Sequence, residues 1–134
     1  MNRKVIVDIA DMKTAGPGTD LITYALGSCL GVAVYDPYIR FGGLLHFMLP
    51  ESKLDAEKAR IRPNMFADTG IINMFRQFKA KGSKGSNLVV KVVGGANIMD
   101  PKGTFNIGKR NFLSLKKVLG SLVCFLKLLM WEVP

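Results

Sequence analysis

Short apolar runs, separated by glycine-rich or charged stretches, set the pattern of the chain. Val5, Val7 and Ile9 fall on one side of a run with a period of two, which predicts a first strand. The run 29–35 is apolar throughout, as is typical of a strand covered on both faces. The β-branched run 88–93 predicts another buried strand. In all, strands are predicted at 4–9, 21–25, 29–35, 42–49 and 88–93, with a loop at 14–18.

A turn at Asp36-Pro37 should join the third and fourth of these strands as an antiparallel hairpin. With the turn centred near Tyr38, nine residues lead back to Cys29 and eight lead forward to His46. This near-symmetry predicts that the thiol and the imidazole lie at the same end of the hairpin.

The longest amphipathic stretch predicts a helix that begins near Ala67. Its apolar residues form one stripe of a helix with a period of 3.6, and they are Ala67, Ile71, Met74, Phe75 and Phe78. Asp68 suits the positive end of the helix dipole, and Gly82 provides a stop. The polar segment 50–63 has no apolar period, so it is predicted to be a surface loop.

A second helix should begin where Asn106 can cap it and end at Gly120, followed by a strand at 121–129. Its inward-facing residues would be Phe112, Leu115 and Leu119. Together these elements predict a mixed α/β (α+β) fold. We expect a largely antiparallel sheet or sandwich flanked by two main helices, in a single domain over 1–134.

Composition and cysteine content indicate the compartment. The chain has 134 residues, of which 49% are hydrophobic, enough for a real core. The first apolar run is broken by Asp8, too early for the core of a signal peptide. The longest apolar stretch, 118–131, contains Lys127 and is too short to cross a bilayer. We therefore expect a cytoplasmic protein whose two cysteines are reduced.

The net charge of +9 lies in the second half of the chain. Residues 1–68 hold eight basic and eight acidic residues, whereas residues 69–134 hold eleven basic residues against Asp100 and Glu132. This asymmetry favours an acidic partner, and a merely solvated basic surface explains it about as well. Nucleic acid is poorly supported, because the sequence has no helix-turn-helix signature and no alternation of arginine with aromatic residues.

A thiol and an imidazole are the candidates for chemistry. Cys29 follows Gly27-Ser28, where glycine allows a sharp turn and backbone N–H groups could face a developing oxyanion. His46 is the single histidine of the sequence, and the hydroxyl of Thr23 could orient its ring. The alternative is structural, since a cysteine among apolar residues is often a small buried hydrophobe and a single histidine is often a structural residue.

Metal and phosphate sites fit the sequence less well. One histidine and two cysteines supply fewer ligands than a closed zinc site needs. Gly94-Gly95 follows a strand, but it lacks the Gly-Lys-Ser/Thr or GxGxxG spacing of a phosphate-binding loop. We therefore predict a site without metal or cofactor, with Gly94-Gly95 allowing a close backbone approach beside it.

Five motifs in this sequence resemble the CheD family, and they occur in the family's order from about Val5 to about Leu119. They are Leu26-Gly27-Ser28-Cys29, Leu45-His46-Phe47-Met48-Leu49-Pro50, Phe66-Ala67-Asp68, Gly94-Gly95-Ala96 and Asn106-Ile107-Gly108-Lys109-Arg110-Asn111. Members of this family are the chemoreceptor glutamine deamidases of bacterial and archaeal chemotaxis.

The resemblance implies hydrolysis of glutamine side chains to glutamate on the cytoplasmic domains of chemoreceptors. Cys29 would be the nucleophile, His46 the base and later the acid, and Thr23 the group that orients His46. As an imidazolium, His46 would lower the pKa of the thiol, and the backbone around Gly27 and Ser28 would support the oxyanion. The resemblance also implies a CheC-type phosphatase as a partner.

The segment 120–134 departs from the family pattern, which continues into further strands and an acidic-Gly-Gly stretch. A truncated end, or a change of reading frame near Leu119, would explain this, and would leave an open sheet edge and doubtful activity. Two alternative functions therefore stay open. One is a non-catalytic chemotaxis regulator that binds receptor or a CheC-type phosphatase, and the other is an unrelated cysteine hydrolase acting on peptides or esters.

Overall fold

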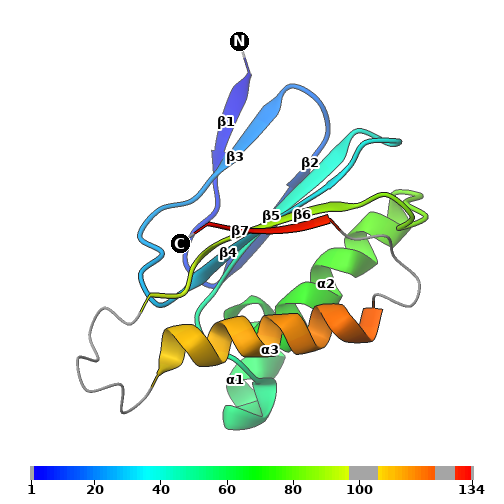
Figure 1. Cartoon of the computed structure of the whole chain (residues 1–134). Helices are drawn as coiled ribbons and strands as arrows, with labels where there is room; N and C mark the ends of the chain where they lie inside the picture. The colour runs from blue at the N-terminus through cyan, green and yellow to red at the C-terminus, as the bar shows by residue number, and fades with distance from the viewer. Residues whose placement is uncertain (1, 97–105, 123–128, 134) are drawn as a thin grey trace.

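A five-stranded sheet and two long helices form the two layers of the fold (Figure 1). The computed structural model describes residues 2–96, 106–122 and 129–133. In spatial order the sheet holds β2 (Asp11–Ala15), β5 (Phe41–Phe47), β4 (Leu30–Asp36), β6 (Val89–Gly94) and β7 (Leu129–Val133). Neighbouring strands are antiparallel except for β6 and β7, which are parallel. This mixed, largely antiparallel architecture confirms the predicted fold class.

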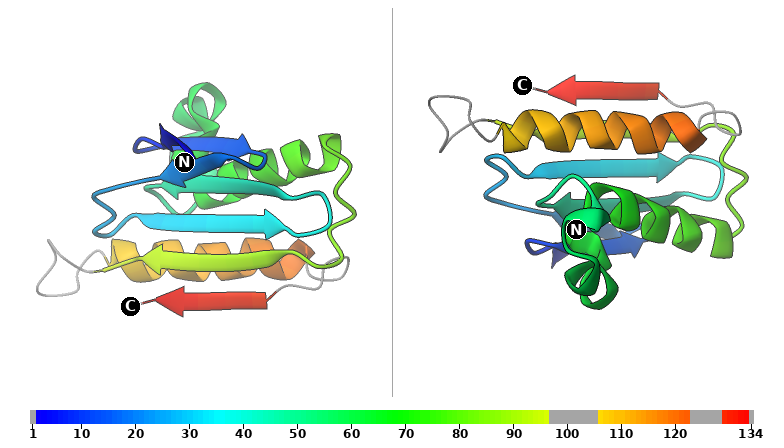
Figure 2. Two further views of the ribbon diagram at one scale, coloured as in Figure 1. Left: turned by 90° about the horizontal axis from the view of Figure 1, so that it is seen from above. Right: turned by 90° about the horizontal axis from the view of Figure 1, so that it is seen from below.

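Helices α2 (Ala67–Ala80) and α3 (Ile107–Leu122) cover the same face of the sheet (Figure 2). Two further strands, β1 (Arg3–Ile6) and β3 (Thr19–Ile22), form a separate parallel pair on the side of the sheet away from these helices. A short helix, α1 (Ala56–Ile61), lies between two single 3₁₀ turns, η1 (Ser52–Leu54) and η2 (Pro63–Met65).

The main core lies between the sheet and the two helices, and alternation along each strand decides which residues enter it. On β4, Leu30, Val32 and Val34 are buried, whereas Tyr35 is 44% exposed. The principal core contributions from the helices are Ile71, Met74 and Phe78 of α2 and Leu115 and Leu119 of α3. Burying each such side chain stabilises the fold by about 1.5–3 kcal/mol. The predicted apolar stripes of both helices are therefore confirmed.

The predicted cover on both faces of the strand at 29–35 is wrong at its far end, because both long helices lie on one side. The opposite face is covered near Cys29, where the Leu26 side chain packs over Gly31. The packing is tight, because a Cβ added at Gly31 would lie 3.2 Å from the Leu26 side chain. The candidate site lies at this end of β4, on the sheet face opposite α2 and α3.

Several predicted boundaries change in the structure. The first strand ends at Ile6, so Ile9 lies outside it and is 46% exposed. Strand β2 is absent from the prediction, because a short, half-buried edge strand has no strong period of its own. Part of it replaces the predicted loop at 14–18.

The segment 50–63 is a helical connection rather than a loop without regular structure. Asp55 caps α1 by accepting a hydrogen bond from the backbone N–H of Lys58 at 3.0 Å. A helix this short buries little, here Ala59, so it leaves no apolar period in the sequence.

Helix α2 has its predicted ends, with Asp68 in its first turn and Gly82 at a φ of +93° just beyond Ala80. Helix α3 continues past Gly120 to Leu122, so the predicted strand at 121–129 is wrong at its start, and the strand described there is β7. The remainder of that prediction, residues 123–128, lies outside the described residues.

Candidate active site

Cys29 is the last residue before β4, and the turn that precedes it is fixed by its carbonyl groups. The Gly27 carbonyl accepts a hydrogen bond from Ala96 N–H at 2.9 Å, and the Cys29 carbonyl accepts one from Gly95 N–H at 2.9 Å. The Ser28 carbonyl accepts from Asn111 Nδ2 at 3.0 Å. Gly27 has a φ of +45°, the left-handed conformation that the predicted sharp turn requires.

These anchors determine which way the backbone N–H groups of the turn point. In a trans peptide the C=O and N–H groups point in opposite directions. The Ser28 N–H is therefore directed away from Ala96, and the Cys29 N–H away from Asn111. A close backbone approach at Gly94 completes the packing, since a Cβ at that residue would lie 2.3 Å from the Cys29 carbonyl oxygen.

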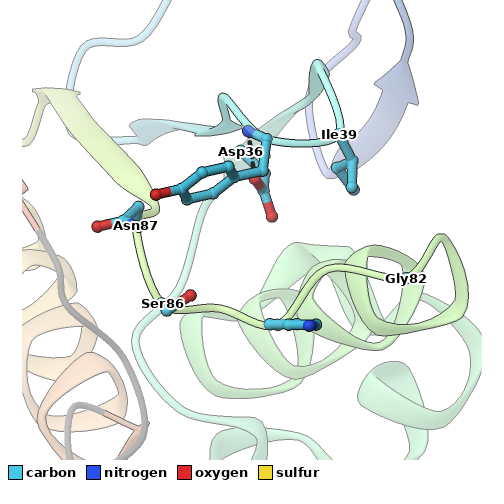
Figure 3. A pocket seen from close by; sticks show the side chains of 7 residues that line it. Asp36, Ile39, Gly82, Ser86 and Asn87 are labelled. Carbon is cyan, nitrogen blue, oxygen red and sulfur yellow. Dashed lines mark hydrogen bonds between the residues drawn. The ribbon is translucent and has the colours of Figure 1, made fainter.

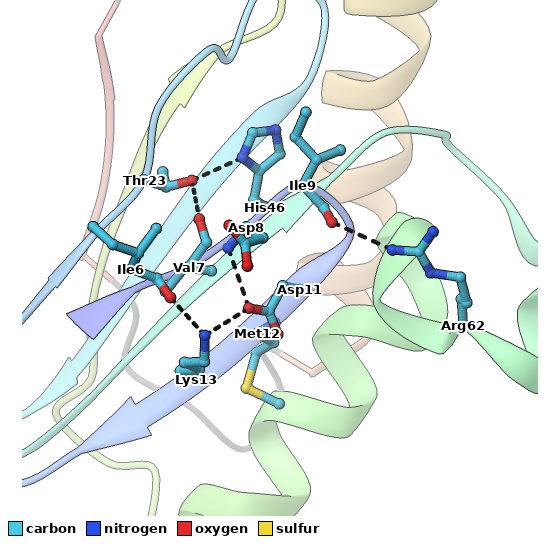
Figure 4. Close-up of polar contacts among 10 residues, drawn as sticks. All are labelled: Ile6, Val7, Asp8, Ile9, Asp11, Met12, Lys13, Thr23, His46 and Arg62. Carbon is cyan, nitrogen blue, oxygen red and sulfur yellow. Dashed lines mark hydrogen bonds and ion pairs between the residues drawn. The ribbon is translucent and has the colours of Figure 1, made fainter.

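His46 lies on β5 with its side chain on the sheet face opposite the helices (Figure 4). Its neighbours Leu45 and Phe47 belong to the core under the helices, so strand alternation turns His46 the other way. There its Nδ1 lies 2.8 Å from Thr23 Oγ1, and that hydroxyl donates to the Val7 carbonyl at 2.7 Å. The contact between Thr23 and His46 that the sequence predicted is thus present.

This pair of hydrogen bonds decides the tautomer of the imidazole. The Thr23 hydroxyl has one proton, and it goes to the Val7 carbonyl, which can only accept. Thr23 Oγ1 must therefore accept from His46, so Nδ1 carries the ring proton. Nε2 of the neutral ring is then an acceptor, and it is buried without a hydrogen-bond partner among the described residues. An unprotonated, unpartnered Nε2 is the form that a general base needs.

The segment that carries the Val7 carbonyl is itself held in place (Figure 4). Lys13 donates to the carbonyl of Ile6 and forms an ion pair with Asp11 at 3.0 Å. Asp11 in turn accepts from the backbone N–H of Asp8 at 3.1 Å. Burial alone would raise the pKa of Asp11, but its hydrogen bonds, led by that from Lys13, outweigh burial and lower it. A fixed, ionised carboxylate therefore supports the turn beneath the Thr23–His46 pair.

The hairpin register places Cys29 and His46 at the same end of β4 and β5, as predicted. Leu30 pairs with Phe47 and Gly31 pairs with His46, so Cys29 stands one residue beyond the last pair. Continued alternation puts Cys29 on the face of Gly31 and His46, diagonal to His46. Diagonal neighbours on one face are about 7–8 Å apart and within reach of long side chains. No hydrogen bond joins Cys29 Sγ to His46 Nε2 in this structure.

Burial moves the two pKa values in opposite directions. Burial raises the pKa of the Cys29 thiol, and the hydrogen bond from its own backbone N–H offsets only part of this. Burial lowers the pKa of His46. Burial therefore favours a thiol and a neutral imidazole over a thiolate and an imidazolium. The expectation that His46, as an imidazolium, lowers the pKa of the thiol stays a prediction, and burial works against it because burial disfavours both charges.

Asn111 is a residue of this site that the sequence analysis included in a family motif but did not assign to the site. It is fully buried on α3, and its Nδ2 donates to the Ser28 carbonyl and, at 2.8 Å, to the Met48 carbonyl. The sequence feature that could have indicated it is its place in the inward stripe of the helix, where Asn111 is polar and the other two positions, Leu115 and Leu119, are apolar.

The described residues hold no group of three or more His, Cys, Asp or Glu side chains that could bind a metal ion. Within the same ranges, no helix has the length and apolar character that crossing a membrane requires. Cys29 is a free thiol, while Cys124 lies outside the described residues.

A cavity of about 310 Å³ opens at the far end of β4 from Cys29 (Figure 3). It is lined by Asp36, Tyr38, Ile39, Gly82, Lys84, Ser86 and Asn87. The carboxylate of Asp36 accepts from Tyr38 N–H at 2.9 Å and from the Ser83 hydroxyl, so it is engaged in holding the turn. This cavity is therefore separate from the thiol and imidazole.

Comparison with known proteins shows which family this chain is similar to. The profile of CheD, described as CheD chemotactic sensory transduction, matches residues 48–125. A probable chemoreceptor glutamine deamidase CheD 1 of Syntrophus aciditrophicus (strain SB) is 48% identical over 115 residues, which are 85% of this chain and 72% of the relative. A probable chemoreceptor glutamine deamidase CheD of Solibacter usitatus (strain Ellin6076) is 46% identical over 117 residues, or 87% and 69% of the two chains.

The profile match begins after Thr23, Cys29 and His46, so it carries no information on their roles. It does span more than half of the chain, and both relatives are covered over more than two thirds of their length. The chain therefore belongs to the CheD family.

Proposed function

We propose that this protein hydrolyses glutamine side chains on chemoreceptor cytoplasmic domains to glutamate and ammonia, using Cys29, His46 and Thr23. The names of its relatives support the reaction and the substrate class. The observation that carries the assignment of residues is the state of His46. Its Nδ1–H is held by Thr23, and its Nε2 is an unpartnered acceptor on the face that Cys29 shares.

Cys29 and His46 form the thioester in the first half of the reaction. As Cys29 Sγ attacks the carboxamide carbon of the glutamine, its proton passes to His46 Nε2. The resulting oxyanion would be met by the backbone N–H groups of Ser28 and Cys29, and one such donor is worth about 10²–10³ in rate. The tetrahedral intermediate then collapses, the C–N bond breaks, and the imidazolium gives its proton to the departing ammonia.

Water completes the reaction in the second half. Neutral His46 takes a proton from a water molecule, whose oxygen attacks the thioester carbon. The C–S bond breaks, the proton returns to sulfur, and the product is the glutamate side chain. Because burial raises the pKa of the thiol and lowers that of the imidazole, it favours proton transfer together with attack over prior formation of an ion pair.

The test incubates the purified chain with a receptor cytoplasmic domain and measures released ammonia together with glutamine-to-glutamate conversion by peptide mass spectrometry. Cys29→Ala should abolish both signals, and His46→Ala should lower the rate by about a hundredfold or more. Cys124→Ala is the matched control and should keep the activity. Faster labelling of Cys124 than of Cys29 by iodoacetamide at neutral pH would contradict the choice of nucleophile.

The same experiment separates the alternative functions. Receptor binding without ammonia release would indicate a regulator, and cleavage of esters or peptides alone would indicate a different cysteine hydrolase. Receptor cytoplasmic domains as substrate would place the reaction in the cytoplasm. A CheC-type phosphatase as partner rests on the family resemblance alone and stays a prediction.

A further inference from the structure

We infer that Asn111 is a positioning residue that fixes the nucleophile turn relative to the strand carrying His46. This inference rests on the proposed roles of Cys29 and His46. The side chain of Asn111 is fully buried, and its Nδ2 donates to two backbone carbonyls. One belongs to Ser28, at 3.0 Å, and the other to Met48, at 2.8 Å.

These two carbonyls stand where the hairpin opens. The last registered pair of β4 and β5 is Leu30 with Phe47. Beyond it the chain leaves the sheet, because Met48 N–H and Leu49 N–H both donate to the carbonyl of Met65, at 2.8 and 3.0 Å. Asn111 thus bridges the two chain ends at the first position where the strand ladder no longer joins them.

Each of the two carbonyls that Asn111 bridges is close in sequence to a residue that the proposed reaction uses. The Ser28 carbonyl belongs to the peptide whose N–H is that of Cys29, so its hydrogen bond fixes the plane of that peptide. The Met48 carbonyl lies two residues after His46. Fixing both with one carboxamide nitrogen therefore sets the separation between the thiol and the imidazole.

Packing alone does not account for an asparagine at this position. Its Oδ1 is buried and has no hydrogen-bond partner within the described part of the chain, which is unfavourable. Leu115, one turn further along the same stripe, is apolar and fully buried. What the carboxamide adds is two N–H donors on one uncharged nitrogen, the number that the two carbonyls need.

Helix α3, which carries Asn111, packs closely against the 94–96 loop, so its position relative to the turn at Ser28 is fixed. A Cβ on Gly108 would lie 2.2 Å from the carbonyl oxygen of Gly95, so α3 approaches the 94–96 loop more closely than any other residue would allow. That loop also holds the carbonyls of Gly27 and Cys29. Turn, loop and helix therefore form one packed unit, and Asn111 connects it to the end of β5.

Ser114 offers a matched control on the same helix. It is buried, and its hydroxyl donates to the carbonyl of Pro50, in the segment that follows Met48. Ser114→Ala therefore removes a buried anchor between α3 and this segment without touching the turn at Ser28.

The test is a double-mutant cycle on the reactivity of Cys29, in a Cys124→Ala background so that one thiol is present. The alkylation rate of Cys29 by iodoacetamide is measured against pH for the parent, His46→Ala, Asn111→Leu, the double variant and Ser114→Ala. Circular dichroism confirms folding. Asn111→Ser, which keeps one donor and adds no bulk, replaces the leucine variant if the latter does not fold.

If Asn111 acts through the pairing of Cys29 with His46, its replacement should slow alkylation at neutral pH by about tenfold or more. It should also shift the pH profile toward that of His46→Ala and slow the His46→Ala variant no further. Ser114→Ala should keep the parent profile.

Additive effects of Asn111 and His46, an equal effect of Ser114→Ala, or no effect of His46→Ala in the parent would each overturn the inference. So would failure of both Asn111 variants to fold, which would make the residue a folding element. Because alkylation needs no receptor, the result does not depend on deamidation. A chain that deamidates receptors but gives an additive cycle would disprove the positioning role alone.

Discussion

Replacing Thr23 by valine tests the tautomer argument most directly, because it removes a hydroxyl and leaves the side-chain shape nearly unchanged. In the native protein this hydroxyl accepts from His46 Nδ1 at 2.8 Å and donates to the Val7 carbonyl at 2.7 Å. The variant loses both bonds at once. His46 and Val7 are 0% and 1% exposed, so water cannot easily replace the lost partner.

The size of the stability loss follows from the two groups left unpaired. A buried donor or acceptor without a partner costs about 1–3 kcal/mol. Moving the ring proton to Nε2 does not remove the unpaired donor, because Nε2 is also buried without a partner among the described residues. The Val7 carbonyl loses its donor as well. We expect Thr23→Val to lower the free energy of unfolding by about 2–4 kcal/mol, with a fall in Tm on the order of 10 °C.

The effect on activity should be smaller than that of removing the imidazole. Thr23 favours the Nδ1–H tautomer by roughly one hydrogen bond, a net of about 1 kcal/mol, which corresponds to about fivefold to tenfold in rate. His46→Ala removes both the base and the acid, each worth about a hundredfold or more. The expected order of rates is native, then Thr23→Val, then His46→Ala.

The assay is ammonia release from a receptor cytoplasmic domain, with Tm measured on the same preparations. Thr14→Val is the matched control, because Thr14 makes one exposed hydrogen bond to Gln77, at 2.9 Å, and has no contact with His46. It should leave the rate unchanged. If Thr23→Val damaged activity more than His46→Ala, with both variants folded, the assigned roles would be reversed. If it behaved like Thr14→Val, the tautomer argument would be refuted.

Two further predictions concern charge. Because burial lowers the pKa of His46 below its unfolded value of 6.5, the unfolded chain takes up this proton first as pH falls. The free energy of unfolding should therefore drop from about pH 6.5 downward, by at most about 1.4 kcal/mol per pH unit, until the pH passes the folded pKa. Urea titrations should show this slope flattened in His46→Asn, and an equal slope in both proteins would contradict it. The second prediction is that kcat/KM falls as ionic strength rises toward about 0.15 M, because salt screens the attraction between a basic surface and an acidic partner. Lys109 and Arg110 are the basic residues to test, since both are exposed in the first turn of α3 although the helix dipole disfavours cations there. Lys109→Glu with Arg110→Glu should mimic high salt with kcat nearly unchanged, whereas a flat salt profile for the native chain would mean that the basic residues are only a solvated surface.

The sequence by itself determined the parts of this protein that depend on local periodicity. The turn after Asp36 and the two apolar runs beside it specify the hairpin, and its register brings Cys29 and His46 to the same end. The stripe from Ala67 to Phe78 specifies α2 in the same way. Each of these features follows from neighbours within a few residues, where strand and helix periods act directly.

Only the tertiary structure decided the state of the candidate site. The Val7 carbonyl that settles the tautomer lies 16 residues from Thr23, and the carbonyls that Asn111 bridges lie 83 and 63 residues from it. No local pattern encodes such pairs. Burial at this site also works against both charges, because it raises the pKa of the Cys29 thiol and lowers that of His46. The cost of desolvating a charge depends on what covers it, and the segments that cover this site come from distant parts of the chain.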